Sequence, residues 1–171
     1  MAAAAMAYSV GATHAQIRDA VRTFPGVEHR LEFVREIGGV AWYNDSRATN
    51  VDATLKAIAA FDGGLWVILG GKDKNSDYAP LAAPLSEKAR GVLLIGAAAK
   101  KIEAHLRSAG PAWSGAAKIF SCDTLGAAVA AAHDRAQPGQ TVLLAPACAS
   151  FDQFENFEHR GREFKRLVRA L

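Results

Sequence analysis

The stretch LWVILGGKDK (65–74) runs from an unbroken apolar segment into two glycines and a charged turn. A strand that is apolar at every position, and not only at every second one, is typical of a parallel sheet covered on both faces. GVLLIG (91–96) and TVLLAP (141–146) repeat this pattern, and segments with helical periodicity stand between and after them. This order predicts an α/β fold, a Rossmann-like and mostly parallel sheet with helices on both faces.

Upstream of this alternation, the sequence predicts two short helices and a β-hairpin. Residues 2–9 form an alanine-rich helical segment that ends before Gly11, and Thr13 can cap a second helix that extends to about Thr23. LEFVREI (31–37) and VAWYN (40–44) have the composition of strands and are joined by two glycines. We therefore expect a hairpin at the start of the main domain.

Length and composition are those of one globular domain. The chain has 171 residues, of which 50% are apolar, and a net charge of +3 from 20 basic and 17 acidic side chains. The basic residues within 160–169 are interpreted as a solvated helix face, because no basic stripe with interleaved aromatics suggests nucleic-acid binding. Cys122 and Cys148 lack the spacing of a metal site and predict free thiols in a reducing compartment. With no signal peptide and no run long enough to span a membrane, we expect a cytoplasmic protein.

Polar residues gather where the strand VAWYN ends, in the stretch DSRATN (45–50). Ligands of open α/β sheets bind beyond the carboxyl ends of the strands. Asp45 is an acceptor suited to ribose hydroxyls or a bound ion, and Arg47 offers a donor fork suited to phosphate or carboxylate. Taken alone, the stretch is also explained by Thr49 or Asn50 capping the next helix and by an internal Asp45–Arg47 ion pair.

Two further strand ends have unusual loops. After Gly70-Gly71, Lys72 and Lys74 form either an anion site or a solvated, self-paired turn, and the P-loop spacing is absent from the chain. In PACASF (146–151) the small residues leave room, and the Ser150 hydroxyl beside a helix start is suited to a carboxylate. Cys148 is interpreted as a small buried residue and not as a nucleophile. The later phenylalanines, Phe151, Phe154, Phe157 and Phe164, are expected mostly in the core.

Four motifs together resemble one family. HRLE (29–32), NDSRATN (44–50), GGKDK (70–74) and PACASFDQFENFEHRG (146–161) are similar to the C-terminal domain of the UDP-N-acetylmuramoyl-L-alanine:D-glutamate ligases, a branch of the Mur ligases. The resemblance covers residues 24–171, and residues 1–23 resemble the tail of that family's central, ATPase domain. In the family reaction, ATP phosphorylates the carboxylate of UDP-MurNAc-L-alanine and the amine of D-glutamate then displaces the phosphate. The resemblance implies a part of an enzyme of peptidoglycan synthesis.

The resemblance also implies roles for single residues. Arg30 would contact the phosphates of ATP and Asp45 its ribose, and His29 and Arg47 match catalytic positions. D-glutamate would be held by Thr49, Lys74, Ser150 and the backbone N–H of Phe157, with Asn50 and Arg160 in support. Arg47 stands where many relatives have lysine, which changes its reach, and Ala145 stands where serine is common.

Other parts of the family pattern are absent from this sequence. The uridine-nucleotide domain and the central domain, with its P-loop and Mg²⁺ ligands, do not match any segment. We therefore expect ATP and Mg²⁺ to act in a full-length enzyme, and this chain to be monomeric and inactive alone. Three alternatives are a stand-alone Rossmann-like module that binds a nucleotide or amino acid, the matching domain of another Mur or folylpolyglutamate ligase, and a scaffold for protein contacts.

Overall fold

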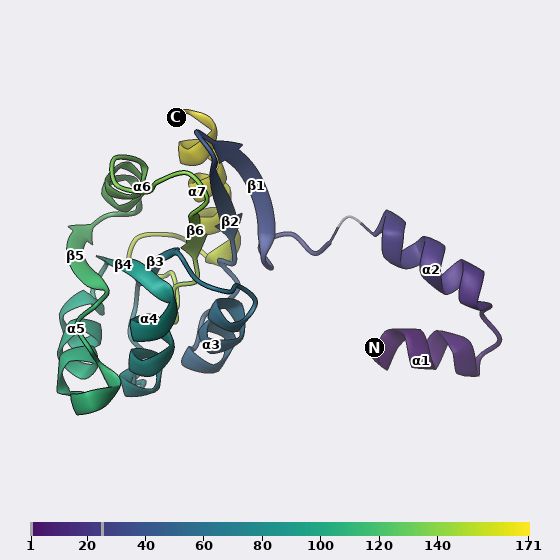
Figure 1. Ribbon diagram of the computed structural model, residues 1–171, viewed down its shortest axis with the longest axis horizontal. Coiled ribbons are helices and arrows are strands. Elements are labelled where there is room, and N and C mark those ends of the chain that lie inside the picture. Colours follow the sequence, from purple (N-terminus) through teal and green to yellow (C-terminus); the bar gives the residue numbers. More distant parts are fainter. Residues whose placement is uncertain (1, 25) are drawn as a thin grey trace.

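The computed structural model describes residues 2–24 and 26–171. Met1, in the expected tail 1–23, and Pro25, in the expected domain 24–171, lie outside the described residues. The first two helices, α1 (Ala2–Ser9) and α2 (His14–Thr23), lie away from the sheet (Figure 1). Thr13 caps α2 as expected, in a capping box with Gln16. Neither helix contains a buried residue, so they add nothing to the core of the main domain.

A six-stranded sheet forms the centre of the main domain, in the order β1-β2-β6-β3-β4-β5 (Figure 1). β1 pairs with β2 in antiparallel orientation, and each of the other neighbouring pairs is parallel. The expected hairpin and mostly parallel sheet are therefore confirmed. The strands are β1 (Glu32–Ile37), β2 (Val40–Asn44), β3 (Leu65–Gly70), β4 (Ala89–Ile95), β5 (Lys118–Asp123) and β6 (Thr141–Leu144).

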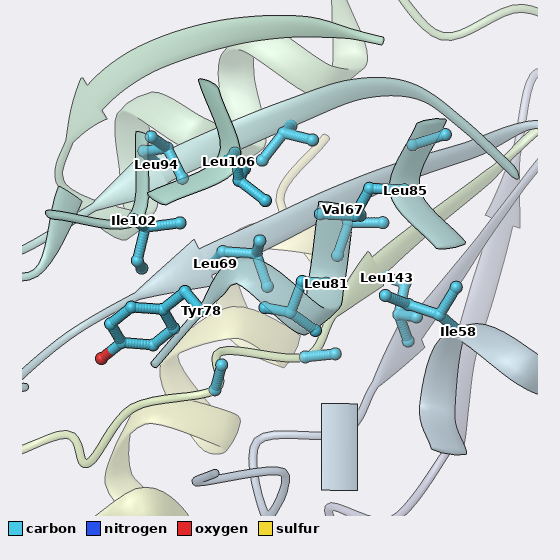
Figure 2. Packing of buried hydrophobic residues seen from close by; sticks show 14 of the residues in the cluster. Ile58, Val67, Leu69, Tyr78, Leu81, Leu85, Leu94, Ile102, Leu106 and Leu143 are labelled. Carbon is cyan, nitrogen blue, oxygen red and sulfur yellow. The ribbon is translucent and has the colours of Figure 1, made fainter. Parts of the chain in front are cut away.

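Helices cover the sheet on both faces. Their bounds are α3 (Val51–Ala59), α4 (Ala82–Lys88), α5 (Ala99–Ser108), α6 (Leu125–His133) and α7 (Phe157–Arg169), with short 3-10 turns η1 (Ala79–Leu81) and η2 (Gly110–Ala112). The fully buried strand β3 sends alternate side chains to the two faces, as a pleated strand must. Leu65, Val67 and Leu69 pack in one cluster with side chains of α3, α4 and α5. Figure 2 shows Val67 and Leu69 within this cluster. Trp66 and Ile68 pack with α6 and α7.

The apolar runs in the sequence thus become central strands because both of their faces are covered. Val67, Leu93 and Leu143 have no exposed surface. Burial of such side chains is worth about 1.5–3 kcal/mol each, and the central strands provide much of the hydrophobic stabilisation. Among the described residues, no helix combines the length and apolar character needed to cross a membrane.

Candidate functional site

Three strand-end loops meet at one edge of the sheet because β6 lies between β2 and β3. Backbone hydrogen bonds join them directly. The Ala147 N–H donates to the Ala48 carbonyl at 2.9 Å, and the Lys72 N–H donates to the Ala149 carbonyl at 2.8 Å. The loop after β6 is therefore bonded to the loop after β2 on one side and to the loop after β3 on the other.

Two glycines let the β3 loop approach its neighbours. Gly70 and Gly71 have φ angles of 122° and 135°, a region that favours glycine. A Cβ atom at Gly70 would overlap the Ile95 carbonyl, and one at Gly71 would overlap the Ala149 carbonyl. These glycines are needed for backbone packing within the protein, whether or not a ligand also approaches them.

Arg160 holds two of the loops together from α7. Its Nε donates to Ser46 Oγ at 2.9 Å, and its two terminal nitrogens donate to the Ser46 carbonyl at 2.8 Å and the Cys148 carbonyl at 3.2 Å. The side chain is fully buried, and this burial lowers the pKa of Arg160 to about 10. The interpretation of 160–169 as a solvated face is thus wrong at Arg160, because periodicity does not show which cation turns toward buried carbonyl oxygens.

The start of α7 is fixed against the β2 loop. Ser46 Oγ donates to the Phe157 carbonyl at 2.8 Å, and Asn156 caps the helix by accepting from the His159 N–H at 2.7 Å. Neither Ser46 nor Asn156 was assigned a role from the sequence, although both lie inside the polar motifs. This arrangement presents the first N–H groups of α7, including that of Phe157, at the loop cluster.

A cavity of about 350 Å³ lies on the α3 side of this edge, and its lining includes Arg30, Asp45, Arg47 and Asn50. Asp45 is 6% exposed, and burial raises the pKa of its carboxyl group, while the Leu31 N–H and Arg30 act in the opposite direction. Asp52 and Lys56 also line the cavity, but they pair with each other at 2.6 Å. The Asp45 carboxylate and the two guanidinium groups form a combination suited to sugar hydroxyls and phosphates.

Arg47 does not pair with Asp45, and no such ion pair occurs in the part of the chain that the structure describes. Its guanidinium lies 5.6 Å from the centre of the Phe157 ring, and its side chain is exposed. Asn50 caps α3 by accepting from the Ala53 N–H at 2.8 Å, so that of the two expected capping residues it is Asn50, and not Thr49, that fills this role.

The residues expected to hold D-glutamate lie on the same loops but not in the lining of this cavity. Lys74 is exposed on the β3 loop, Thr49 is half-buried on the β2 loop, and Ser150 is 2% exposed on the β6 loop. Phe157 is half-buried at the start of α7, but Phe151 is 65% exposed, which contradicts its expected place in the core. Phe151 lies in a turn before α7, where helical spacing does not apply.

His29 is buried beneath the β2 loop, at 2% exposure. Its Nδ1 is 2.9 Å from Asn44 Nδ2, and its carbonyl accepts from the Arg47 N–H at 3.2 Å. Within the described residues its Nε2 has no hydrogen-bond partner, and desolvation lowers the pKa of the ring. His29 therefore supports Arg47 through the backbone and does not itself face the cavity.

Glu28, His29 and Glu32 bring one potential metal ligand each within 4.8 Å of one another. However, the Lys165 ammonium group donates to Glu28 Oε1 at 2.6 Å and to Glu32 Oε1 at 2.9 Å. The lysine therefore already supplies the positive charge, and its contacts lower the pKa of the Glu28 carboxyl. Lys165 is a second cation of 160–169 that is not solvated, since its side chain is 11% exposed.

Comparisons with known proteins agree with this arrangement. A model of the family described as Mur ligase, glutamate ligase domain, matches residues 29–148. The chain is 59% identical over 171 residues to UDP-N-acetylmuramoylalanine--D-glutamate ligase of Solibacter usitatus, and the match covers 100% of this chain and 37% of that protein. The chain is also 55% identical over 170 residues to the protein of the same name from Acidobacterium capsulatum, and this match covers 99% of this chain and 35% of that protein. The chain thus spans little more than a third of the length of these relatives.

Solved structures share the fold at low sequence identity. The structure described as E. coli FolC in complex with DHPP and ADP has a TM-score of 0.63 and 20% identity, over 98% of this chain and 37% of that chain. The murein peptide ligase mpl of Psychrobacter arcticus has a TM-score of 0.59 and 16% identity, over 99% of this chain and 36% of that chain. From the matched family model and the identity to the curated relatives, the chain belongs to the Mur ligase family, as its glutamate ligase domain.

Proposed function

We propose that the chain is the amino-acid-binding domain of an ATP-dependent ligase that joins D-glutamate to UDP-MurNAc-L-alanine in cytoplasmic peptidoglycan synthesis. The observation that carries this proposal is the meeting of three strand-end loops, two of them bonded by Arg160, next to a cavity that presents Arg30, Asp45 and Arg47. The names of the relatives supply the substrate pair. The relatives are longer than this chain, so the complete reaction belongs to a longer polypeptide.

The cavity side of the site would hold the nucleotide. The buried Asp45 carboxylate would accept hydrogen bonds from the ribose hydroxyls, and the exposed guanidinium of Arg30 would contact phosphate oxygens. The exposed guanidinium of Arg47, which lies over the Phe157 ring, would turn its donors toward a phosphate. His29 would act as a positioning residue, since its carbonyl group accepts the Arg47 N–H.

The loop side would hold D-glutamate. Its two carboxylates would be matched by the ammonium of Lys74, the hydroxyls of Thr49 and Ser150, and the first N–H groups of α7 at Phe157. The neutral amine would then attack the carbonyl carbon of the acyl phosphate and form the amide, and inorganic phosphate would leave. Asn50 and Arg160 would support these groups by fixing α3 and the two loops.

Mg²⁺ is implied by the family, but the described residues do not fit it. Mg²⁺ requires oxygen ligands in octahedral geometry. The group of Glu28, His29 and Glu32 includes an imidazole, and Lys165 bonds both of its carboxylates. We therefore expect the Mg²⁺ ligands in a preceding part of the longer polypeptide.

Residues 1–23 would form the tail of that preceding part, and 24–171 the glutamate-binding domain. In support, Met6 of α1 and Val21 of α2 are 69% and 70% exposed, and Val10, in the turn between the two helices, is 85% exposed. Such exposure of apolar side chains in adjacent helices is typical of a surface that another domain covers.

NMR titration of the 171-residue chain with D-glutamate and with L-glutamate tests the proposal. We expect backbone shifts at Thr49, Lys74 and Ser150 with the D-enantiomer, and weaker shifts with the L-enantiomer. Lys74→Ala should remove the response, whereas Lys72→Ala, an exposed neighbour on the same loop, should retain it. Equal responses to both enantiomers, or shifts confined to other regions, would contradict the site assignment. ATP-dependent ligation by the chain alone would contradict its proposed dependence on a preceding domain.

A further inference from the structure

A chain of polar contacts runs beneath the candidate site and uses residues to which the proposed reaction gives no role. Lys101 Nζ, on α5, lies 2.7 Å from Asp73 Oδ2. The Tyr78 hydroxyl lies 2.8 Å from Asp73 Oδ1 and 3.1 Å from Cys148 Sγ. The contacts thus connect α5, the β3 loop and the β6 loop in sequence.

The protonation states along this chain fix the direction of each hydrogen bond. The hydrogen bond from Lys101 is the main reason that the pKa of Asp73 is lowered to about 2, so the carboxylate is ionised and can only accept. Tyr78 must therefore donate its proton to Asp73. Burial raises the pKa of Cys148 to about 11, so the thiol keeps its proton and can donate it to the Tyr78 oxygen. Each donor in this series of contacts, from Lys101 to Cys148, then has an acceptor.

Two members of this series of contacts, Asp73 and Cys148, lie next to residues of the proposed D-glutamate site. Asp73 directly precedes Lys74. Its Oδ1 also accepts a hydrogen bond from the Ser76 N–H at 3.1 Å, and this bond closes the turn around Lys74. Cys148 stands two residues before Ser150, and the Cys148 carbonyl accepts from Arg160 at 3.2 Å. Both Tyr78 and Cys148 are buried, at 0% and 1% exposure, so water does not replace either contact.

We propose that Tyr78 is a positioning residue for the amino-acid site, because its hydroxyl joins the turn that carries Lys74 to the loop that carries Ser150. This inference rests on the proposed function, and adds a residue that does not touch the substrate. With the hydroxyl in place, the ammonium and the serine hydroxyl keep one spacing, which a dicarboxylate ligand requires for simultaneous contact. Without it, Lys101 still holds the turn and the Lys72 N–H still bonds the Ala149 carbonyl, but the side-chain link from Asp73 to Cys148 is lost.

The test compares Tyr78→Phe with Tyr43→Phe. The first removes the hydroxyl and keeps the buried ring, which lies edge-on to His105. Tyr43 is a matched control, since it is a half-buried strand residue whose ring packs against Phe33 and Phe61. In the ligand-free chain, Tyr78→Phe should shift the backbone NMR signals of both Lys74 and Ser150 and speed their amide exchange. Tyr43→Phe should leave both signals in place.

A second arm uses the longer ligase that carries this domain. Loss of one hydrogen bond predicts a rise of about two- to tenfold in KM for D-glutamate in Tyr78→Phe, with kcat within about twofold of the original. Cys148→Ala should reproduce the effect, and Cys148→Ser, which retains a donor, should not. This second pair also decides the matter should Tyr78→Phe fold poorly.

The outcomes separate the two proposals. If Tyr78→Phe shifts the NMR signals of Lys74 but not those of Ser150, the proposed link between the two loops through Tyr78 is overturned. An unchanged KM for D-glutamate would likewise overturn the positioning role. If the original ligase does not use D-glutamate, the proposed function fails, and the ligand-free comparison still accepts or rejects the link between the two loops.

Discussion

Replacement of Arg160 by methionine should destabilise the fold and separate two loops of the candidate site. Methionine has a similar length but no hydrogen-bond donor. The variant would leave the Ser46 and Cys148 carbonyl groups buried without the guanidinium that now bonds them. Because these groups belong to different loops, the change removes a link between distant parts of the sequence.

The expected magnitude follows from two opposing contributions. Arg160 donates three hydrogen bonds, and a hydrogen bond that involves a charged group contributes about 1.5–3 kcal/mol. Burial of the cation opposes them, since a pKa lowered to about 10 corresponds to a cost of about 3 kcal/mol. With bonds of middling strength, the balance favours arginine by about 3 kcal/mol. Arg160→Met should lower the free energy of unfolding by that amount.

Urea unfolding followed by tryptophan fluorescence measures this difference. Trp42 and Trp66 are both buried in the sheet core and report on its unfolding. Arg166→Met is the matched control, because Arg166 lies on the same helix but is exposed and pairs with Glu163 at 2.7 Å. An exposed pair of this kind contributes at most about 1 kcal/mol.

The reasoning would be refuted by an Arg160→Met variant that loses no more stability than Arg166→Met. Arg160→Lys provides a second check, since lysine keeps the charge but cannot reproduce the planar fork. It should lose most of the same stability. A lysine variant as stable as the original would show that the charge alone, and not the three-way geometry, holds the loops.

Three further changes have defined signs. Gly161→Ala should destabilise the protein, although alanine favours helices, because its Cβ would overlap the His29 ring. Gly126→Ala should stabilise the protein by about 0.5–1 kcal/mol, because the nearest neighbour of its Cβ would lie at 4.0 Å. Urea unfolding that gives the two variants stability changes of the same sign would contradict this reasoning. Asn50→Ala should cost about 1 kcal/mol through loss of the α3 cap, and a change near zero in the same assay would argue against that cap. Acidification from about pH 7 to about pH 5.5 should lower stability, because burial keeps the pKa of His29 below its usual value of about 6.5 and the unfolded chain therefore binds the proton first. The stability is present above the unfolded pKa and is lost as the pH falls below it; His29→Gln should reduce this slope, and an unchanged slope would exclude His29 as its source.

Most of the fold could be predicted because its local signals are strong. The run from Leu65 to Leu69 is apolar at every position and becomes a central strand with both faces covered. Thr13 and Asn50 mark helix starts through their side-chain acceptors, and both cap helices in the structure. Such signals act over a few residues, so they can be read without knowledge of the rest of the chain.

The contacts within the site could not be predicted in the same way. Polarity marked the β2 loop as special, but it suggested an Asp45–Arg47 pair, whereas Arg47 stacks on Phe157. Helical periodicity placed Arg160 among solvated cations, although its donors reach carbonyl groups on two remote loops. Burial of a cation depends on where acceptors from other segments lie, and sequence spacing within one helix contains no such information.

Strand order is the step that turns separate motifs into a site. The pattern of alternating strands and helices fits several orders, and in many of them the loops after β2, β3 and β6 would not be neighbours. Insertion of β6 between β2 and β3 makes the last loop the common neighbour of the other two, and its length lets α7 return across them. Arg160 from α7 and Tyr78 from the segment after β3 then meet the same residue, Cys148, through its carbonyl and its thiol. One buried residue on the central loop is therefore contacted from both sides, between the backbone hydrogen bonds that Ala147 and Ala149 make to the two outer loops.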